Sequence, residues 1–419
     1  MNFEWSSRTL GELSVNHDGK RKPVKESDRT PGPYPYYGAS GIVDSVDGYL
    51  FDGPHLLIGE DGENLRTRQT PIAFMANGKF WVNNHAHIVT GNELAETRFL
   101  MYALLNSDIN PYLTGAVMPK LTQGNLNRIL LPCPPREVQS EIVGVLGLLD
   151  DRIAHLRETN ATLEAIAQAL FKSWFVDFDP VRAKQQGLVP VGMDEATAAL
   201  FPGGFNDSAL GSIPLGWQVR PIAEVVEAVF DGPHATPPES DEGPVFLGIK
   251  NLTGAALDLG DVRHIAEADF AQWTKRATPR PGDIVFSYEA TLGFFALIPP
   301  GLRCCLGRRL ALIRPQAEQA DGHFWFHQFI AAPFQRLLAQ HTIQGATVNR
   351  IALKHFPSYS VLCPPAGLRT AFDACVAPLW SRIHANQAQA QTLTAVRDNL
   401  LPRLISGQLR LPAAEALLA

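Results

Sequence analysis

The chain carries the same sequence framework twice, and this repeat limits its fold more than any other feature. Gly115-Ala116 opens a segment that ends at Cys133-Pro134-Pro135, and Gly345-Ala346 opens one that reaches Cys363-Pro364-Pro365 with the same spacing. The offset continues without an insertion through the apolar positions that follow, which pair as Leu149 with Leu379, Ile153 with Ile383, Leu163 with Leu393 and Leu170 with Leu400. Such a repeat, in a chain of 419 residues, predicts two equivalent halves that each bury a core of their own.

The beginnings of the two halves also correspond, whereas their middles do not. Trp5 followed by Leu10-Gly11-Glu12-Leu13 resembles Trp217 followed by Ile222-Ala223-Glu224-Val225. Between these starts and the Gly-Ala segments the similarity disappears. This pattern is typical of a common scaffold that presents two different recognition surfaces, so the sequence predicts two variable domains with shared ends.

A long helix is expected after each Cys-Pro-Pro junction. Apolar residues recur every three or four positions from Val138 to Trp174, which is the period of a helix-helix seam. Pro134-Pro135 and Asp179-Pro180 bound this stretch, because proline disrupts a helix and restricts the residue before it. The predicted seam comprises Ile142, Leu149, Ile153, Leu156, Leu163 and Leu170 in the first helix and Phe372, Cys375, Leu379, Ile383, Leu393, Leu400 and Leu404 in the second.

The two helices are expected to pair with each other, antiparallel, and to hold the variable domains apart; alternatively, each helix recruits a separate partner. Asn160 interrupts the first apolar stripe, and Asn386 and Ala390 interrupt the second. An asparagine at such a position either is buried and fixes the register of the pair, or is exposed and has no such role. Pro402 leaves the end of the second helix open.

Both variable middles contain short apolar runs separated by turn signals, which is typical of mixed α/β domains. Polar residues between these runs suit nucleic acid, because lysine and arginine contact phosphates and guanine, and asparagine matches the edge of adenine. The candidate DNA-binding residues are Lys20, Arg21, Lys22, Tyr36, Tyr37, Asn83, Asn84, His85, Lys120, Lys250, Asn251, Ser287, Tyr288, Thr291, Asn349 and Arg350. The alternative is that these residues serve only as solvated turn residues.

Composition excludes some functions and leaves others open. The net charge of −6 neither supports nor excludes DNA binding, which needs only a local basic face. No apolar run is long enough to span a membrane and no signal peptide begins the chain, so a cytoplasmic location is expected. The five cysteines lack zinc spacing, and the phosphate-binding, dinucleotide-binding and amino-methyltransferase motifs are missing. The sequence therefore predicts no metal site, no catalytic residue and no cofactor in this chain.

Taken together, these motifs resemble those of the DNA-specificity subunit of Type I restriction-modification systems, over essentially the whole chain. The resemblance rests on the two tryptophan starts, the two Cys-Pro-Pro junctions and the helix end from Leu170 to Pro180. The segment from Pro281 to Leu297 is similar to the family's Pro-Gly-Asp-Ile strand, followed by glycine and a second apolar strand. In the first middle, residues 36–41, 59–62 and 83–87 are similar to one widespread class of target recognition domain.

The resemblance implies an α+β fold, in which two mixed α/β target recognition domains are separated by the family's two long conserved helices, paired as an antiparallel coiled coil. Each domain would read one half of a split, asymmetric DNA site. The expected segments are a first recognition domain at 1–135, a first helix at 136–178, a linker at 179–210, a second recognition domain at 211–365, a second helix at 366–406 and a C-terminal tail at 407–419.

The resemblance also implies partners. Two modification subunits would dock on the helices and use S-adenosylmethionine to methylate adenine N6, for which the adenines are flipped out of the duplex. Two restriction subunits would use ATP and magnesium to translocate and cut unmethylated DNA, and the chain itself would not be an enzyme. The alternative function is a coiled-coil scaffold that binds proteins without DNA specificity; a DNA affinity that falls steeply with salt distinguishes the two.

Overall fold

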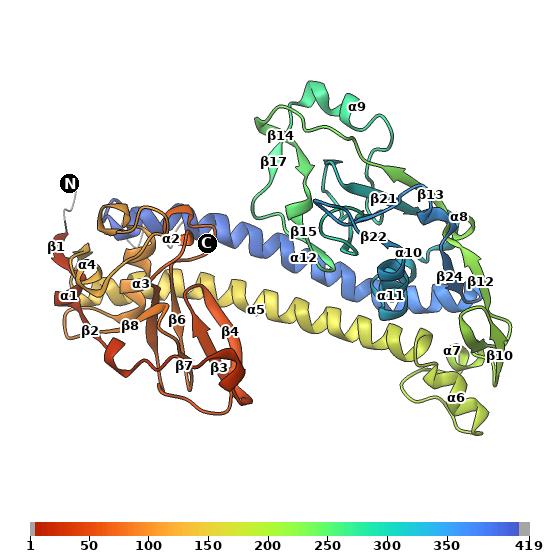
Figure 1. Ribbon diagram of the computed structural model, residues 1–419, viewed down its shortest axis with the longest axis horizontal. Coiled ribbons are helices and arrows are strands. Elements are labelled where there is room, and N and C mark those ends of the chain that lie inside the picture. The colour runs from red at the N-terminus through yellow and green to blue at the C-terminus, as the bar shows by residue number, and fades with distance from the viewer. Residues whose placement is uncertain (1–4, 410–419) are drawn as a thin grey trace. The chain divides into compact units, whose positions relative to one another are not determined.

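The structure is a computed structural model that describes residues 5–409, which fall into two compact units. Unit 1 comprises Met1–His155 and Thr392–Ala419, and unit 2 comprises Leu156–Gln391. Each unit contains one domain of strands and short helices together with parts of two 40-residue helices, α5 (Arg136–Phe175) and α12 (Ala366–Ile405) (Figure 1). Within the described residues, no helix has the length and apolarity that crossing a membrane requires.

The domain of unit 1, here called domain 1, is built from two small sheets. Its elements are β1 (Ser6–Thr9), α1 (Leu10–Leu13), β2 (Ser14–Asn16), β3 (Pro31–Gly38), β4 (Gly41–Val46), β5 (His55–Gly59), α2 (Asn64–Thr67), β6 (Ala73–Ala76), β7 (Trp81–Val82), β8 (Ala86–Gly91), α3 (Thr97–Leu105), α4 (Gln123–Asn127) and β9 (Leu130–Cys133). Four strands form an antiparallel sheet in the order β2-β8-β5-β6, and α3 packs against its last three strands. In the second sheet, of order β4-β3-β7, β3 pairs antiparallel with β4 and parallel with β7.

The domain of unit 2, domain 2, repeats the strand order and the strand directions of both sheets. Its elements, with those that precede it after α5, are α6 (Asp179–Gln185), α7 (Glu195–Ala199), β10 (Phe205–Ser208), β11 (Gly211–Pro214), β12 (Gln218–Pro221), α8 (Ile222–Val225), β13 (Val226–Asp231), β14 (Ser240–Leu247), β15 (Leu252–Thr253), β16 (Ala256–Leu257), β17 (Arg263–His264), α9 (Phe270–Trp273), β18 (Ile284–Ser287), β19 (Phe295–Leu297), β20 (Cys304–Leu306), β21 (Leu310–Pro315), α10 (Gly322–Ile330), α11 (Ala332–Gln340), β22 (Thr342–Ile343), β23 (Arg350–Ile351) and β24 (Ser360–Cys363). The larger sheet has the order β13-β21-β18-β19, and the smaller has the order β17-β14-β20 with the same strand directions as in domain 1. The two middles therefore share a fold although their sequences do not resemble each other.

The shared ends of the two halves form the same closing ladder in both domains. In domain 1, β1 pairs antiparallel with β9, and in domain 2, β12 pairs antiparallel with β24. Each ladder brings the tryptophan start of its half to the Cys-Pro-Pro junction, from which the long helix departs. The segment 179–210, expected to be a linker, contains α6, α7 and β10.

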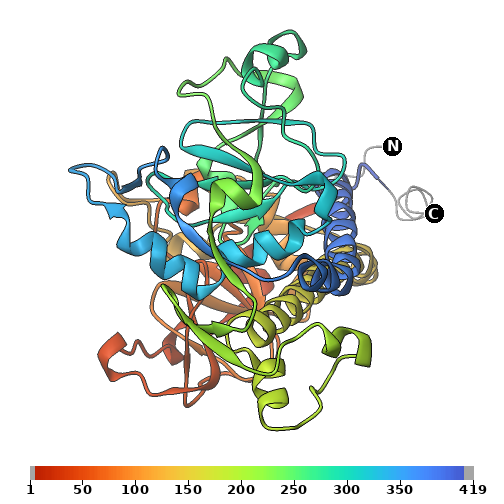
Figure 2. The ribbon, with the colours of Figure 1, turned by 90° about the vertical axis from the view of Figure 1, so that its right-hand side faces the viewer.

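The long helices pair antiparallel, as expected from the sequence. In unit 1 the start of α5 and the end of α12 share one apolar core, which includes Ile142, Leu149, Leu400 and Leu404. In unit 2 the end of α5 packs with the start of α12, and Figure 2 shows these two parts, yellow and blue, side by side. Both helices begin at the expected residues, α5 ends three residues and α12 one residue before the expected limit, and α12 continues through Pro402 to Ile405, so its far end is helical.

One part of the predicted seam is shifted by a residue. Cys375 is exposed and Leu379 only partly buried, whereas Val376 and Trp380 are buried, in line with Phe372 and Ile383. The expectation for Cys375 was therefore wrong. The repeat aligns Cys375 with Val145, an apolar residue of the first helix. Burial in α12 instead follows the aromatic core of domain 2, in which Trp380 packs beside Phe326 and His327.

Asn160 and Asn386 are buried in the seam of unit 2 and bond to each other. The amide of Asn386 donates to Oδ1 of Asn160 at 2.8 Å, and the amide of Asn160 donates to the carbonyl of Ile383 at 3.1 Å. The side chain of Asn160 is 7% exposed and that of Asn386 is 2% exposed. Of the two interpretations left open by the sequence, the buried one is therefore correct for both asparagines. A hydrogen-bonded pair of this kind fixes the register of two helices, because a shift along the seam would bury each amide without its partner.

We expect Asn386→Leu to destabilise unit 2 by about 1–3 kcal/mol, because Asn160 is then left buried without its partner. Asn160→Leu should cost a similar amount, and the double variant should cost clearly less than the two single variants together. Urea titration of the four proteins measures these free energies of unfolding. Strictly additive losses would show that the two amides do not act as a pair.

Candidate nucleic-acid interface

Three loops meet at one end of the large sheet of domain 1, and we call them the three-loop face of that domain. They are residues 60–62 after β5, residues 83–85 before β8, and the hairpin loop 114–120. Backbone hydrogen bonds join them: Glu60 donates to the carbonyl of His85 at 2.8 Å, Leu121 donates to that of Glu60 at 2.8 Å, and Gly62 donates to that of Pro119 at 3.1 Å. These bonds bring together three segments that lie far apart in the sequence.

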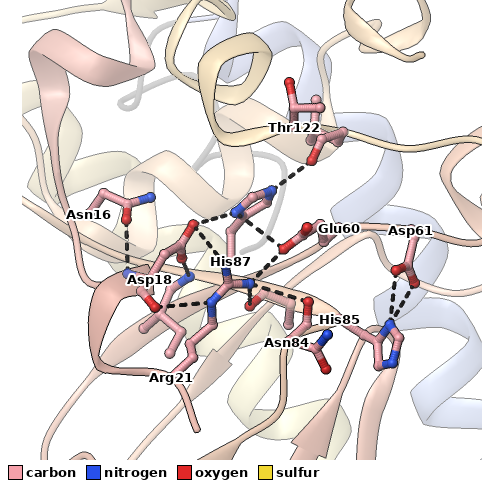
Figure 3. Close-up of polar contacts among 12 residues, drawn as sticks. Asn16, Asp18, Arg21, Glu60, Asp61, Asn84, His85, His87 and Thr122 are labelled. Atoms are coloured by element: carbon pink, nitrogen blue, oxygen red, sulfur yellow. Dashed lines mark hydrogen bonds and ion pairs between the residues drawn. The ribbon is translucent and has the colours of Figure 1, made fainter. Parts of the chain in front are cut away.

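The side chains on this face include two pairs of acidic and basic groups and the side-chain amide of Asn84. Nδ1 of His85 lies 2.8 Å from Oδ2 of Asp61, and Nζ of Lys120 lies 3.3 Å from Oε1 of Glu60. Asn84 is exposed, and its side-chain amide has no hydrogen-bond partner in the described residues, as Figure 3 shows. The face therefore offers an uncommitted amide between two ion pairs.

A buried polar network under the loops holds them in place. The Arg21 guanidinium lies 2.6 Å from Oε2 of Glu60 and donates to the carbonyls of Ala86 at 2.8 Å and Asn84 at 3.4 Å (Figure 3). His87, only 1% exposed, has Nδ1 2.6 Å from Oδ2 of Asp18. The cluster thus ties β8 and the loop before it to the segment that follows β2.

The contacts of this network lower the pKa of its two carboxylates. Nε2 of His87 lies 2.7 Å from the carbonyl oxygen of Leu121, and its Nδ1 lies 2.6 Å from Oδ2 of Asp18. Burial on its own would raise the pKa of Asp18, but the His87 hydrogen bond and charge, the Ile88 amide and nearby Arg21 together hold that pKa below its usual value. Burial is likewise outweighed at Glu60, whose pKa is lowered chiefly by Arg21 and His87. These charges support the loops, because each is partnered inside the domain.

Domain 2 contains an equivalent three-loop face, formed by residues 288–290, 307–309 and 343–350. The same three kinds of backbone bond join its loops: Tyr288 donates to the carbonyl of Arg309 at 3.2 Å, Ile351 to that of Tyr288 at 2.8 Å, and Ala290 to that of Asn349 at 2.9 Å. One ion pair is also matched, because Nε of Arg309 lies 3.8 Å from Oε1 of Glu289. Asp61 and His85 of domain 1 thus correspond to Glu289 and Arg309.

The glycine that opens the repeated Gly-Ala segment is explained by these loops. A Cβ on Gly115 would lie 2.1 Å from the carbonyl oxygen of Met118, and a Cβ on Gly345 would lie 2.2 Å from that of Val348. Only glycine allows this close approach of two backbone segments. Both halves keep the residue because both build the same exposed hairpin loop.

The support under the loops of domain 2 uses different residues. The Tyr288 hydroxyl donates to Oδ1 of Asp231 at 2.9 Å, and Arg276 lies 3.2 Å from the other carboxylate oxygen. Burial and this hydrogen bond raise the pKa of Tyr288, so the phenol stays protonated. Two non-glycine residues of the face, Ala290 and Arg309, have φ of 67° and 76°, a costly backbone conformation that the surrounding contacts must maintain.

The structure divides the predicted DNA-binding residues into exposed and supporting ones. Several lie on the two faces with accessible side chains, namely Asn83, Asn84, His85, Lys120, Thr291, Asn349 and Arg350. Lys20 and Lys22 are exposed on the loop that carries Arg21, and Lys250 is exposed with Nζ 2.5 Å from Oδ2 of Asp261.

Other predicted residues have no free surface for a base or phosphate. Tyr36, Asn251, Ser287 and Tyr288 are buried, and Tyr37 packs its ring against Phe74 and Phe80. The amide of Asn251 is used entirely inside the domain, where it donates to the carbonyls of Asp258 and Asp261 and accepts from Gly248. Arg21 belongs to this group too, since its charge is satisfied by Glu60 and Asp18. These side chains shape the faces from inside, and direct contact through them does not fit the folded domains.

Sequence reasoning missed Arg308 and Arg309, which occupy the place of Asn84 and His85 in domain 2. Arg308 is exposed and forms no ion pair among the described residues, and with Arg309 and Arg350 it outnumbers the single acid of that face, Glu289. The available signal was Gly307-Arg308-Arg309 itself, a turn with two adjacent cations between two apolar runs. The three-loop face of domain 2 thus carries more basic than acidic residues, although the chain as a whole has a net charge of −6.

No cluster of three metal-binding side chains occurs among residues 5–409. Cys304 and Cys305 are buried in β20, where burial raises the pKa of each thiol to about 12. A thiol with that pKa stays protonated and is a poor nucleophile, so these cysteines act as packing residues.

Comparisons with known proteins agree with this architecture. A family model described as the Type I restriction modification DNA specificity domain matches residues 2–165. A type I restriction enzyme specificity subunit of Methanocaldococcus jannaschii is 26% identical over 97% of this chain and 94% of its own length. A type I specificity subunit of Haemophilus influenzae is 23% identical over 85% of this chain and 84% of its own.

The fold has a solved counterpart. The crystal structure of a type I restriction-modification S subunit from M. genitalium matches with a TM-score of 0.58 at 15% identity, and the match covers 96% of both chains. At that identity the likeness concerns the fold alone. Residues 2–165 thus match the Type I restriction modification DNA specificity domain, and the chain is similar along most of its length to the specificity subunits of type I restriction enzymes.

Proposed function

We propose that this chain is the DNA-specificity subunit of a type I restriction-modification complex, in which each domain reads one half of a bipartite, asymmetric DNA site. The observation that carries the proposal is the doubled three-loop face: one backbone framework occurs twice and displays different side chains. Two domains with identical faces would recognise a symmetric site. Domain 1 presents Asn-Asn-His at residues 83–85 and domain 2 presents Gly-Arg-Arg at residues 307–309, which suits two different half-sites.

The partners and cofactors belong to the proposal as well. Modification subunits would dock on the helix pair and methylate adenine N6 with S-adenosylmethionine, and restriction subunits would use ATP and magnesium. This chain would then contribute recognition and assembly, without chemistry of its own. The paired helices would also set the spacing between the half-sites, since a helix rises about 1.5 Å per residue and resists bending.

The scaffold alternative has no observation in its favour. A surface that only binds protein does not need a face with three arginines around one acid, as domain 2 has. The two functions also differ in their response to salt, because binding through phosphates weakens steeply as salt rises.

Methylation mapping in the host tests the proposal directly. We expect long-read sequencing of a strain that carries this chain and its modification subunits to show an adenine-methylated motif in two parts separated by a fixed spacer. Deletion of this chain alone should abolish the motif, whereas deletion followed by re-expression should restore it. Methylation that is unchanged by the deletion would contradict the proposed role.

A further inference from the structure

The turn before β8 in domain 1 and the turn before β21 in domain 2 are the same structural position. In both domains this turn follows a strand of the small sheet, β7 or β20, that pairs parallel with β3 or β14. Its first residue donates to the last paired residue of that neighbour: Asn83 to the carbonyl of Tyr37 at 3.0 Å, and Gly307 to that of Leu247 at 2.7 Å. Asn84 therefore corresponds to Arg308.

These two residues are the uncommitted members of their turns. His85 and Arg309, which follow them, are engaged by Asp61 and Glu289. Asn84 and Arg308 are exposed, and neither side chain has a polar partner within the described residues. Each thus projects an unsatisfied set of hydrogen-bonding groups from a turn that its own domain holds in place.

The backbone beneath each side chain is fixed before any ligand arrives. In domain 1, Arg21 holds the carbonyls of Asn84 and Ala86, and Oδ1 of Asn83 accepts from the amide of His85 at 2.8 Å. In domain 2, Gly307 packs so closely that a Cβ there would lie 2.6 Å from the carbonyl oxygen of Leu247. A rigid support lowers the entropic cost of binding and makes contact geometry selective.

We propose that Asn84 and Arg308 occupy one base-reading position, used in both domains, at which domain 1 selects adenine and domain 2 selects guanine. This inference rests on the proposed DNA-reading function. An asparagine amide donates and accepts together, which matches N7 and the N6 amino group of adenine in the major groove. An arginine fork donates twice, which matches O6 and N7 of guanine.

Methylation mapping of single variants, with all partner subunits present, tests the two assignments separately. Arg308→Ala should relax or abolish the requirement for one guanine in one half-site and leave the other half-site unchanged. Asn84→Ala should do the same for one adenine in the opposite half-site. Binding of the wild-type duplex by the complex should weaken roughly tenfold or more for each variant, because a bidentate base contact is lost.

Two matched controls lie outside the three-loop faces. Arg303→Ala removes an exposed arginine just before β20, and Asn77→Ala removes an exposed asparagine just after β6. Both should leave the motif unchanged. The reciprocal variant Arg308→Asn, which alters no internal contact, should replace the guanine requirement by a preference for adenine.

The methylation patterns distinguish a failure of the base-reading assignment from a failure of the proposed DNA-reading function. If wild-type methylation shows no two-part motif, the proposed function itself fails. If the motif exists but Arg308→Ala keeps the same guanine and only weakens methylation evenly at all sites, Arg308 contacts phosphate and the base-reading assignment is overturned. An unaltered motif and affinity in Arg308→Ala would show that this turn does not touch DNA.

Discussion

Asp283→Ala should destabilise domain 2 by about 3–5 kcal/mol, the largest stability effect that we expect from a single substitution in this chain. Asp283 is the aspartate of the Pro-Gly-Asp-Ile segment, and its carboxylate is buried against Arg314, with Oδ1 2.9 Å from Nε and Oδ2 2.7 Å from Nη2. Oδ2 also accepts from the amide of Arg280 at 2.8 Å. Without the carboxylate, the Arg314 side chain, which is 9% exposed, would retain the carbonyl of Thr278, the face of the Phe230 ring and the charge of Glu227 as its partners among the described residues.

Urea titration of Asp283→Ala, Arg314→Met and the double variant checks this result. The double variant should lose markedly less stability than the two single variants together, because it leaves no unpaired charge buried. Glu267→Ala breaks an exposed pair with Arg303 in the same domain and should leave the unfolding midpoint nearly unchanged. A small loss in Asp283→Ala would mean that water reaches Arg314 in the folded domain.

Unit 2 should lose roughly 3 kcal/mol of stability between pH 6.5 and pH 4 through His327. This histidine is 1% exposed and lies among the rings of Phe171, Phe326, Phe372 and Trp380. Its Nδ1 donates to the carbonyl of His323 at 2.9 Å, and its Nε2 has no hydrogen-bond partner among residues 5–409. Burial lowers the pKa of His327 to about 4, so the unfolded chain takes up a proton near pH 6.5 while the folded domain stays neutral.

Because the unfolded chain binds this proton at a higher pH than the folded domain does, the free energy of unfolding decreases as the pH falls. Above pH 6.5 neither state is protonated at this residue and the stability is fully present; as the pH falls toward 4 it is progressively lost. Free energies of unfolding measured from pH 7.5 to pH 4.5 should fall less steeply for His327→Phe than for the wild-type chain. His384, whose pKa is also lowered by burial, contributes to what remains. The exposed His234→Phe serves as the control, and equal slopes in His327→Phe and wild type would refute the assignment.

The repeat, the long helices and their antiparallel pairing could be worked out from the order of residues alone. Helical periodicity and proline boundaries are local properties, and an uninterrupted offset between two copies survives in the sequence because an insertion would break the seam. The mixed α/β character of both domains followed in the same way, from short apolar runs between turn residues. Only the exact seam at Cys375 and Val376 differed, since the core of domain 2 decides which face of α12 is covered.

The composition of the two faces was decided by tertiary structure. Asn84 and Arg308 share no sequence context, and their equivalence arises from backbone hydrogen bonds among loops that are distant in the chain. Burial separated accessible candidates from supporting ones for the same reason: Ser287 and Tyr288 look like turn residues in the sequence, but Ser287 ends the central strand β18, Tyr288 follows it directly, and both side chains are buried. Local patterns specify helices and strands, whereas the surface that meets a ligand depends on long-range contacts, which no single stretch of sequence contains.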